Sequence, residues 1–118
     1  MEDAAVVAKL DQAWRARVTA EPRGQLEAWR QREPDTEHRL TIATTASQHL
    51  LALVCARFGL RVYRRPRMHS STLSVEAPAG FVREMLWPLF ESMAHIIEDA
   101  ADETTSRIMQ RWSRGDET

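Results

Sequence analysis

The sequence predicts a small α+β domain in which several helices enclose one β-hairpin. Apolar residues recur at every third or fourth position over residues 3–18, 46–58 and 78–112, which is the period of an amphipathic helix. Between residues 60 and 76 they alternate instead, as in strands that bury one face. The chain has 118 residues, 43% hydrophobic and 28% charged, so it can bury one core and is far from the composition of disordered proteins.

The first 34 residues are expected to form a helical hairpin. An apolar stripe from Val6 to Val18 marks the first helix. This helix should end near Ala20, because the residue before Pro22 is disfavoured in the α region. Pro22 suits the first turn of a second, short helix that reaches about Arg32.

A central helix follows, and the sequence leaves its start open. Asp35 or Thr36 is an early candidate for the N-cap, and Thr45 or Ser47 is a later one. Part of the stretch between them alternates like a strand but contains alanines that suit a helix. The helix is expected to end at Gly59, where a left-handed C-terminal cap fits.

Two short alternating runs, separated by about five residues, predict a β-hairpin over residues 60–76. Its apolar face is expected to carry Leu60, Val62, Leu73 and Val75, and this face needs a cover. The opposite, polar face is expected to carry Arg61, Tyr63, Arg65, Thr72, Ser74 and Glu76.

Residues 78–112 predict one long C-terminal helix, which is expected to cover the hairpin. Its apolar stripe is wider than the narrow seam of a coiled coil. Pro88 lies inside it and lacks a backbone donor, so a kink or break is expected near Trp87. The single domain is thus expected to comprise a helical hairpin at 1–34, a helix–hairpin–helix core at 35–112 and a frayed tail at 113–118.

These elements favour a homodimer. A two-stranded sheet is marginally stable alone, and the C-terminal apolar stripe is wider than one hairpin and two short helices require. Both needs are met if two chains join their hairpins or pair their last helices. We therefore expect two copies of the chain to associate.

The sequence also predicts a cytoplasmic location with no membrane partner. Its longest apolar runs are too short to cross a bilayer, and its acidic start lacks the features of a signal peptide. Cys55 is the single cysteine, so no disulfide can form within the chain. Its apolar neighbours predict a buried thiol.

Charge is distributed unevenly along the chain. There are 16 basic and 17 acidic residues, yet residues 38–75 hold six arginines and no carboxylate, so this window carries +6 and the rest −7. Arginines for phosphates, a tyrosine for stacking and a ribbon that fits a major groove favour a nucleic-acid-associated accessory or regulatory protein. The candidate residues are Arg61, Tyr63, Arg64, Arg65, Arg67 and His69.

The same arginines have a commoner explanation, in which they pair with carboxylates of the last helix. Acidic residues at three- and four-residue spacing form a charged face on that helix. Those that would compete with nucleic acid are Glu91, Glu98, Asp99, Asp102 and Glu103.

A second hypothesis is a protein-interaction or assembly subunit. The break at Pro88 would open a hydrophobic notch that accepts a partner helix or strand. The alternative is that these apolar side chains simply fill the core. The candidate interface residues are Phe81, Trp87, Pro88, Phe90, Met93 and Ile97.

No motif of the sequence names a reaction, so we expect no enzyme activity, no cofactor and no metal. The four glycines form no phosphate-binding loop, and the four histidines show no metal-ligand spacing. A metal site that joins His95 to Glu91, Glu98 or Asp99 is a weaker third hypothesis. The segment 53–90 is similar in general style to small bacterial α+β proteins, a likeness that implies no activity.

Overall fold

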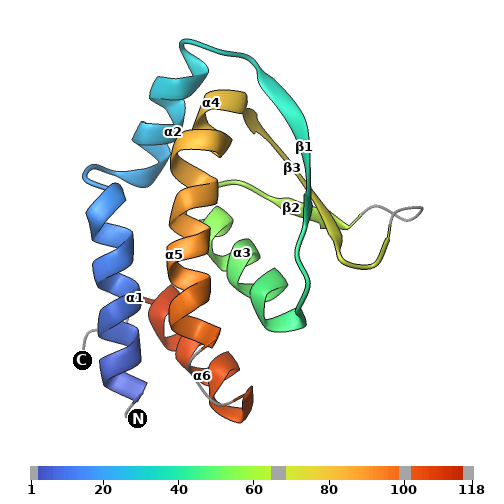
Figure 1. Ribbon diagram of the computed structural model, residues 1–118. Coiled ribbons are helices and arrows are strands. Elements are labelled where there is room, and N and C mark those ends of the chain that lie inside the picture. Colours follow the sequence, from blue (N-terminus) through green and yellow to red (C-terminus); the bar gives the residue numbers. More distant parts are fainter. Residues whose placement is uncertain (1–2, 65–68, 99–101, 116–118) are drawn as a thin grey trace.

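The computed structural model describes residues 3–64, 69–98 and 102–115, and it has the predicted α+β fold. A three-stranded antiparallel sheet lies beside the helices, which gather on one side of it (Figure 1). The elements in chain order are α1 (Asp3–Arg17), α2 (Pro22–Arg30), β1 (Asp35–Thr41), α3 (Thr45–Arg57), β2 (Val62–Arg64), β3 (Thr72–Pro78), α4 (Ala79–Phe81), the π-helical turn η1 (Val82–Leu86), α5 (Trp87–Glu98) and α6 (Asp102–Ser113).

The two N-terminal helices are confirmed. Helix α1 buries Val6, Leu10 and Trp14 along one stripe. Helix α2 begins at Pro22, and the Glu21 carboxylate caps it by accepting backbone N–H groups of the first turn at 3.2 and 2.8 Å. These contacts satisfy donors that a helix start leaves without an intrahelical partner.

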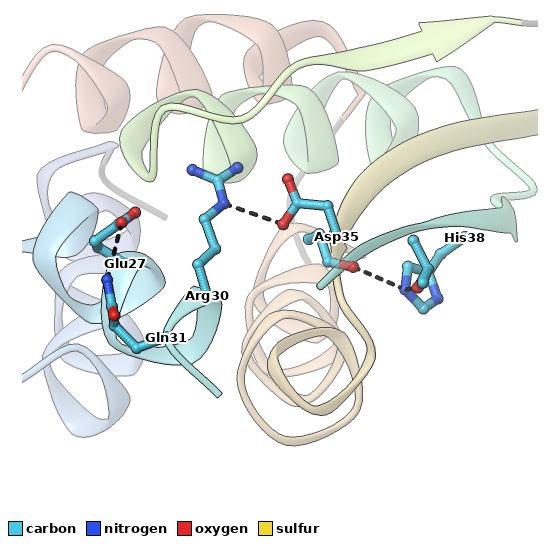
Figure 2. Close-up of polar contacts among 7 residues, drawn as sticks. Glu27, Arg30, Gln31, Asp35 and His38 are labelled. Atoms are coloured by element: carbon cyan, nitrogen blue, oxygen red, sulfur yellow. Dashed lines mark hydrogen bonds and ion pairs between the residues drawn. The ribbon is translucent and has the colours of Figure 1, made fainter. Parts of the chain in front are cut away.

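A short polar junction joins α2 to β1 (Figure 2). The Arg30 Nε donates to the Asp35 carboxylate at 3.1 Å, at the point where the strand begins. Further along β1, His38 Nε2 lies 2.9 Å from the Thr36 hydroxyl and 3.1 Å from the Ala77 carbonyl oxygen of β3. Because a carbonyl oxygen only accepts, the His38 ring carries its hydrogen on Nε2. The junction thus ties the start of β1 to both α2 and β3.

Strand β1 was not predicted, and the early helix cap at Asp35 or Thr36 is wrong. Residues 35–41 pair antiparallel with β3, from Asp35 opposite Pro78 to Thr41 opposite Thr72. The strand has one aliphatic side chain, Leu40, so its alternation is too weak to mark a strand in the sequence. Its extended conformation is instead held by pairing with β3 along its whole length.

The β-hairpin is confirmed, and β3 is the central strand of a β1-β3-β2 sheet. Val62 pairs with Val75 and Tyr63 with Ser74, so the paired residues lie on the predicted faces. Leu60 and Arg61 precede β2, and Arg65 lies outside the described residues. Leu73 and Val75 are buried on the face that the helices cover. The polar face of the same strands carries Tyr63 and Ser74.

Helix α3 is the predicted central helix, with the later start. Thr44, rather than Thr45 or Ser47, is its N-cap, and the Thr44 hydroxyl accepts from the Ser47 N–H at 3.0 Å. The helix ends at Arg57, and Gly59, just beyond the Phe58 C-cap, has a φ of +81°. A left-handed residue at this place is favourable for glycine alone, as the sequence predicts.

The helical structure is continuous from α4 through η1 into α5, so in place of the predicted kink or break near Trp87 there is a single π-helical turn just before Pro88. The Trp87 N–H bonds to the Val82 carbonyl, five residues back, in the turn before the proline. The wider turn relieves the clash that a proline ring makes with the carbonyl four residues earlier. The wider turn also changes the spacing of buried residues. Phe81 and Leu86 are five positions apart and both fully buried, so the same apolar face of the helix points toward the core on both sides of the turn.

The single long C-terminal helix is wrong, because α5 ends at Glu98 and α6 is a separate helix. Helix α6 packs against α1 and α3 (Figure 1). It buries Ile108, Met109 and Trp112, and the Trp112 ring meets Trp14 of α1 edge-on at 5.7 Å. Helix α6 thereby covers apolar surface that, in the predicted homodimer, a second chain would cover.

Arg57, at the end of α3, lies in an aromatic cluster of the core. Its guanidinium carbon is 4.3 Å from the ring centroid of Trp14 and 4.7 Å from that of Trp112. Phe58 extends the cluster, with ring centroids 5.1 Å from Trp14 and 5.1 Å from Phe81. This cluster joins α1, α3, α4 and α6.

The thiol of Cys55 is buried in α3, as predicted. Burial raises the pKa of this thiol to about 12, because a thiolate would lose its hydration there. Within the described ranges, no helix is both long and apolar enough to cross a membrane.

Candidate binding surfaces

The polar face of the sheet is open and carries charges of both signs. The β1 register places Glu37 opposite Glu76 and Arg39 opposite Ser74 on the face that also carries Tyr63. Ser74 is only 1% exposed, and its hydroxyl donates to Glu37 at 2.8 Å. Arg39 lies 3.6 Å from the other Glu37 oxygen. The unpredicted strand therefore brings carboxylates next to the basic hairpin.

The hairpin candidates do not share one surface. Arg64 extends over the opposite face, where its Nη2 donates to Gln48 of α3 at 2.7 Å and its Nη1 to the Ser70 carbonyl at 3.3 Å. Tyr63 is 44% exposed on the polar face. Arg61, directly before β2, is exposed as well.

The remaining hairpin candidates add little to a basic stripe. His69 is exposed, and its Nδ1 lies 2.6 Å from the Ser71 hydroxyl. Arg65 and Arg67 lie outside the described residues. The expected alternative, pairing with the acidic helix, is not seen for the described part of the hairpin, where neither Arg61 nor Arg64 contacts a carboxylate of α5.

A groove of about 300 Å³ lies between α5 and the segment that links β1 to α3. Its apolar lining residues are Ile42, Ala43, Trp87, Phe90 and Ala94. Ile42 and Phe90 are 3% and 5% exposed and belong to the core, whereas Trp87 and Ala94 are half-buried. The Trp87 and Phe90 rings are 5.6 Å apart and tilted by 40°. We call this feature the Trp87 groove.

The rim of the Trp87 groove is polar. Three hydroxyl-bearing residues line one side: Thr41 at the end of β1, Thr44 in the link, and Ser47 in the first turn of α3. From α5, Glu91, His95 and Glu98 line the other wall, and His95 Nδ1 lies 3.6 Å from the Glu98 carboxylate. The three α5 residues share one helix face because they are four and three positions apart.

Hydrogen bonds to the backbone hold both walls of the groove. The Ile42 N–H donates to the Ser71 carbonyl at 2.9 Å, and its carbonyl accepts from the Gln48 side chain at 3.0 Å. On the other wall, the Trp87 N–H bonds to the Val82 carbonyl in the π-helical turn that precedes Pro88. The groove is therefore a built feature of the fold rather than a gap between loose segments.

The predicted interface residues fall into two groups. Trp87 and Phe90 line the groove, and Pro88 lies half-buried beside them in the first turn of α5. Phe81, Met93 and Ile97 are core residues with exposures of 0%, 0% and 3%. Sequence reasoning missed the wall opposite α5, which includes Ile42, Thr44 and Ser47.

Within the described ranges, no three His, Cys, Asp or Glu side chains come together as metal ligands. Comparison of the chain with protein-family models, curated proteins and solved structures finds no match.

Proposed function

We propose that the chain is a non-enzymatic binding module that takes a protein segment in the Trp87 groove. The observation that carries this proposal is an apolar groove of about 300 Å³ whose lining contains a half-buried tryptophan. Concave apolar surfaces with a few polar groups at the rim are typical binding sites, and tryptophan is a frequent energetic centre of interfaces. A helix or strand that inserts one apolar side chain would bury Trp87 and Ala94 further.

Nucleic-acid binding by the hairpin is the second candidate, supported by the exposed ring of Tyr63 and by the exposed Arg61 two positions before it in the chain. The distribution of charges on the hairpin gives nucleic-acid binding less support than the Trp87 groove gives to binding of a protein segment. Glu37 and Glu76 lie on the same face as Tyr63, and Arg64 is on the other face. Binding to single-stranded or duplex DNA that weakens steeply with salt, and that Arg61→Ala reduces, would establish this candidate.

We also propose a cytoplasmic homodimer, although the two needs that predicted it are now met within one chain. Strand β1 completes the sheet, and α6 covers the apolar surface. What still supports association is that β1 and β2 are open edges of the sheet. Light scattering at micromolar concentration tests this, and a monomer mass contradicts it.

Panning a random peptide library on the immobilised chain tests the groove proposal. Ala94→Arg places a long side chain in the groove, whereas Ala28→Arg makes the same change at an exposed site on α2. We expect the selected peptides to bind the wild type and the Ala28→Arg variant, and not to bind the Ala94→Arg variant. Peptides that bind all three proteins equally would place the binding surface elsewhere.

A further inference from the structure

We infer that the Trp87 groove takes a basic peptide segment, with an apolar side chain that enters the groove and Arg or Lys beside it. This inference rests on the proposed function and specifies the chemistry of its partner. Its starting point is the charge of the lining, because the 11 residues that line the groove include Glu91 and Glu98 and no Lys or Arg. A partner of the same sign would be repelled, and one of opposite sign would be steered toward the groove.

The two carboxylates are placed to flank an inserted side chain. Glu91 and Glu98 are seven positions apart on α5, so they lie about two turns apart on the same helix face. The apolar surface of Trp87, Phe90 and Ala94 lies along the same stretch of α5. An apolar anchor can therefore fill the groove while cations on both sides reach the carboxylates.

The carboxylates are available to a partner. Both are exposed, and in the described part of the chain Glu91 makes no ion pair, whereas Glu98 lies near His95 alone. Trp87 adds a second attraction, because an arginine that stacks on its half-buried ring gains a cation–π contact. Arginine is therefore expected to be preferred over lysine next to the anchor.

The groove and its rim are expected to contribute differently to binding, because apolar burial and exposed ion pairs differ in free energy. Exposed ion pairs contribute little free energy each, whereas burial of one large aliphatic side chain contributes more. The anchor should therefore determine most of the affinity, and the two carboxylates should determine which peptides bind. The test must separate these two contributions.

Three labelled peptides, KRLLRK, QSLLSQ and EDLLDE, make this separation in fluorescence anisotropy titrations at low salt. We expect KRLLRK to bind about fivefold more tightly than QSLLSQ, and EDLLDE to bind more weakly than either. Glu91→Gln/Glu98→Gln should remove the preference for KRLLRK and leave QSLLSQ unchanged. The control Glu27→Gln/Glu76→Gln changes net charge equally, away from the groove, and should preserve the preference.

The outcomes distinguish this inference from the proposed function. Equal affinity of KRLLRK and QSLLSQ, with both lost in Ala94→Arg, overturns the basic specificity and leaves the groove as a binding site. Retention of KRLLRK binding by Ala94→Arg places it elsewhere and overturns both. Absence of KRLLRK binding to the wild type also overturns the inference.

Discussion

The Glu33 carboxylate accepts a hydrogen bond from the Gly80 N–H at 2.8 Å, across 47 positions of the chain. It satisfies a donor at the start of α4, where the Pro78 N-cap makes no side-chain hydrogen bond. Glu33→Ala should lower the free energy of unfolding by about 1 kcal/mol, the usual effect of losing a helix cap. Urea unfolding measures this, with the exposed Glu27→Ala as control. Equal stability of the two variants would show that the contact does not cap the helix.

Gly80 is required because the Trp29 ring lies against its backbone. A Cβ at this position would approach the ring to 2.5 Å. Gly80→Ala should therefore destabilise the protein by about 1–3 kcal/mol through overpacking. Gly24 in α2 is the matched control, since a Cβ there meets its nearest atom at 3.5 Å, an ordinary contact. Gly24→Ala should leave stability unchanged or raise it slightly, and a similar loss in both variants would contradict the prediction.

The contact of Arg57 with two tryptophan rings should stabilise the core. Arg57→Met keeps an apolar stem but removes the cation, so we expect a loss of about 1–2 kcal/mol in the free energy of unfolding. Arg17→Met, at an exposed position at the end of α1, should change stability by less than about 0.5 kcal/mol. Chemical unfolding followed by tryptophan fluorescence compares the two. If Arg57→Met is as stable as Arg17→Met, the cation contributes nothing beyond its stem.

The ion pair between Asp3 of α1 and Arg107 of α6 predicts an acid dependence. The Arg107 Nε lies 2.6 Å from the carboxylate, and this hydrogen bond lowers the pKa of Asp3 below its ordinary value of 3.8. The contribution to stability is present above that ordinary value and is lost as pH falls through the lowered pKa. An NMR titration should show the low pKa and its return to the ordinary range in Arg107→Gln. An unchanged titration in Arg107→Gln would refute the pairing in solution.

Sequence reasoning succeeded where the local pattern is strong and failed where pairing between distant segments decides the structure. The hairpin and Gly59 follow from alternation and from the left-handed cap. Strand β1 has Leu40 as its one aliphatic residue, so its pairing with β3 is a long-range effect. Helix α6 packs against α1 through the contact between Trp14 and Trp112. These residues are far apart in the sequence, so the spacing of apolar residues within one segment does not predict their contact.

The Trp87 groove was half predictable for the same reason. The proline in the last long apolar segment marks Trp87 and Phe90 as residues beside a break. The opposite wall is formed by the link between β1 and α3, in which Ile42 follows the strand directly and is buried in the core. Without the strand, nothing in the sequence places Ile42 next to α5.

The buried thiol of Cys55 predicts an alkaline dependence of stability. Burial raises its pKa to about 12 in the folded chain, whereas the pKa of an unfolded cysteine is about 8.5. Above that lower value the unfolded state has lost a proton that the folded state retains, so stability falls as pH rises, until the pH passes the folded pKa. For this group the slope approaches about 1.4 kcal/mol per pH unit.

Urea unfolding of the wild type and Cys55→Ala across alkaline pH isolates this effect. Groups other than the thiol titrate alike in both proteins, so the difference between them reports Cys55. We expect the stability advantage of the wild type over Cys55→Ala to shrink as pH rises above about 8.5. A thiol reagent at pH 8 should label the wild type only as fast as the chain opens, because the thiolate is the reactive form. A constant difference in stability, or rapid labelling of the folded chain, would mean that Cys55 is not buried in solution.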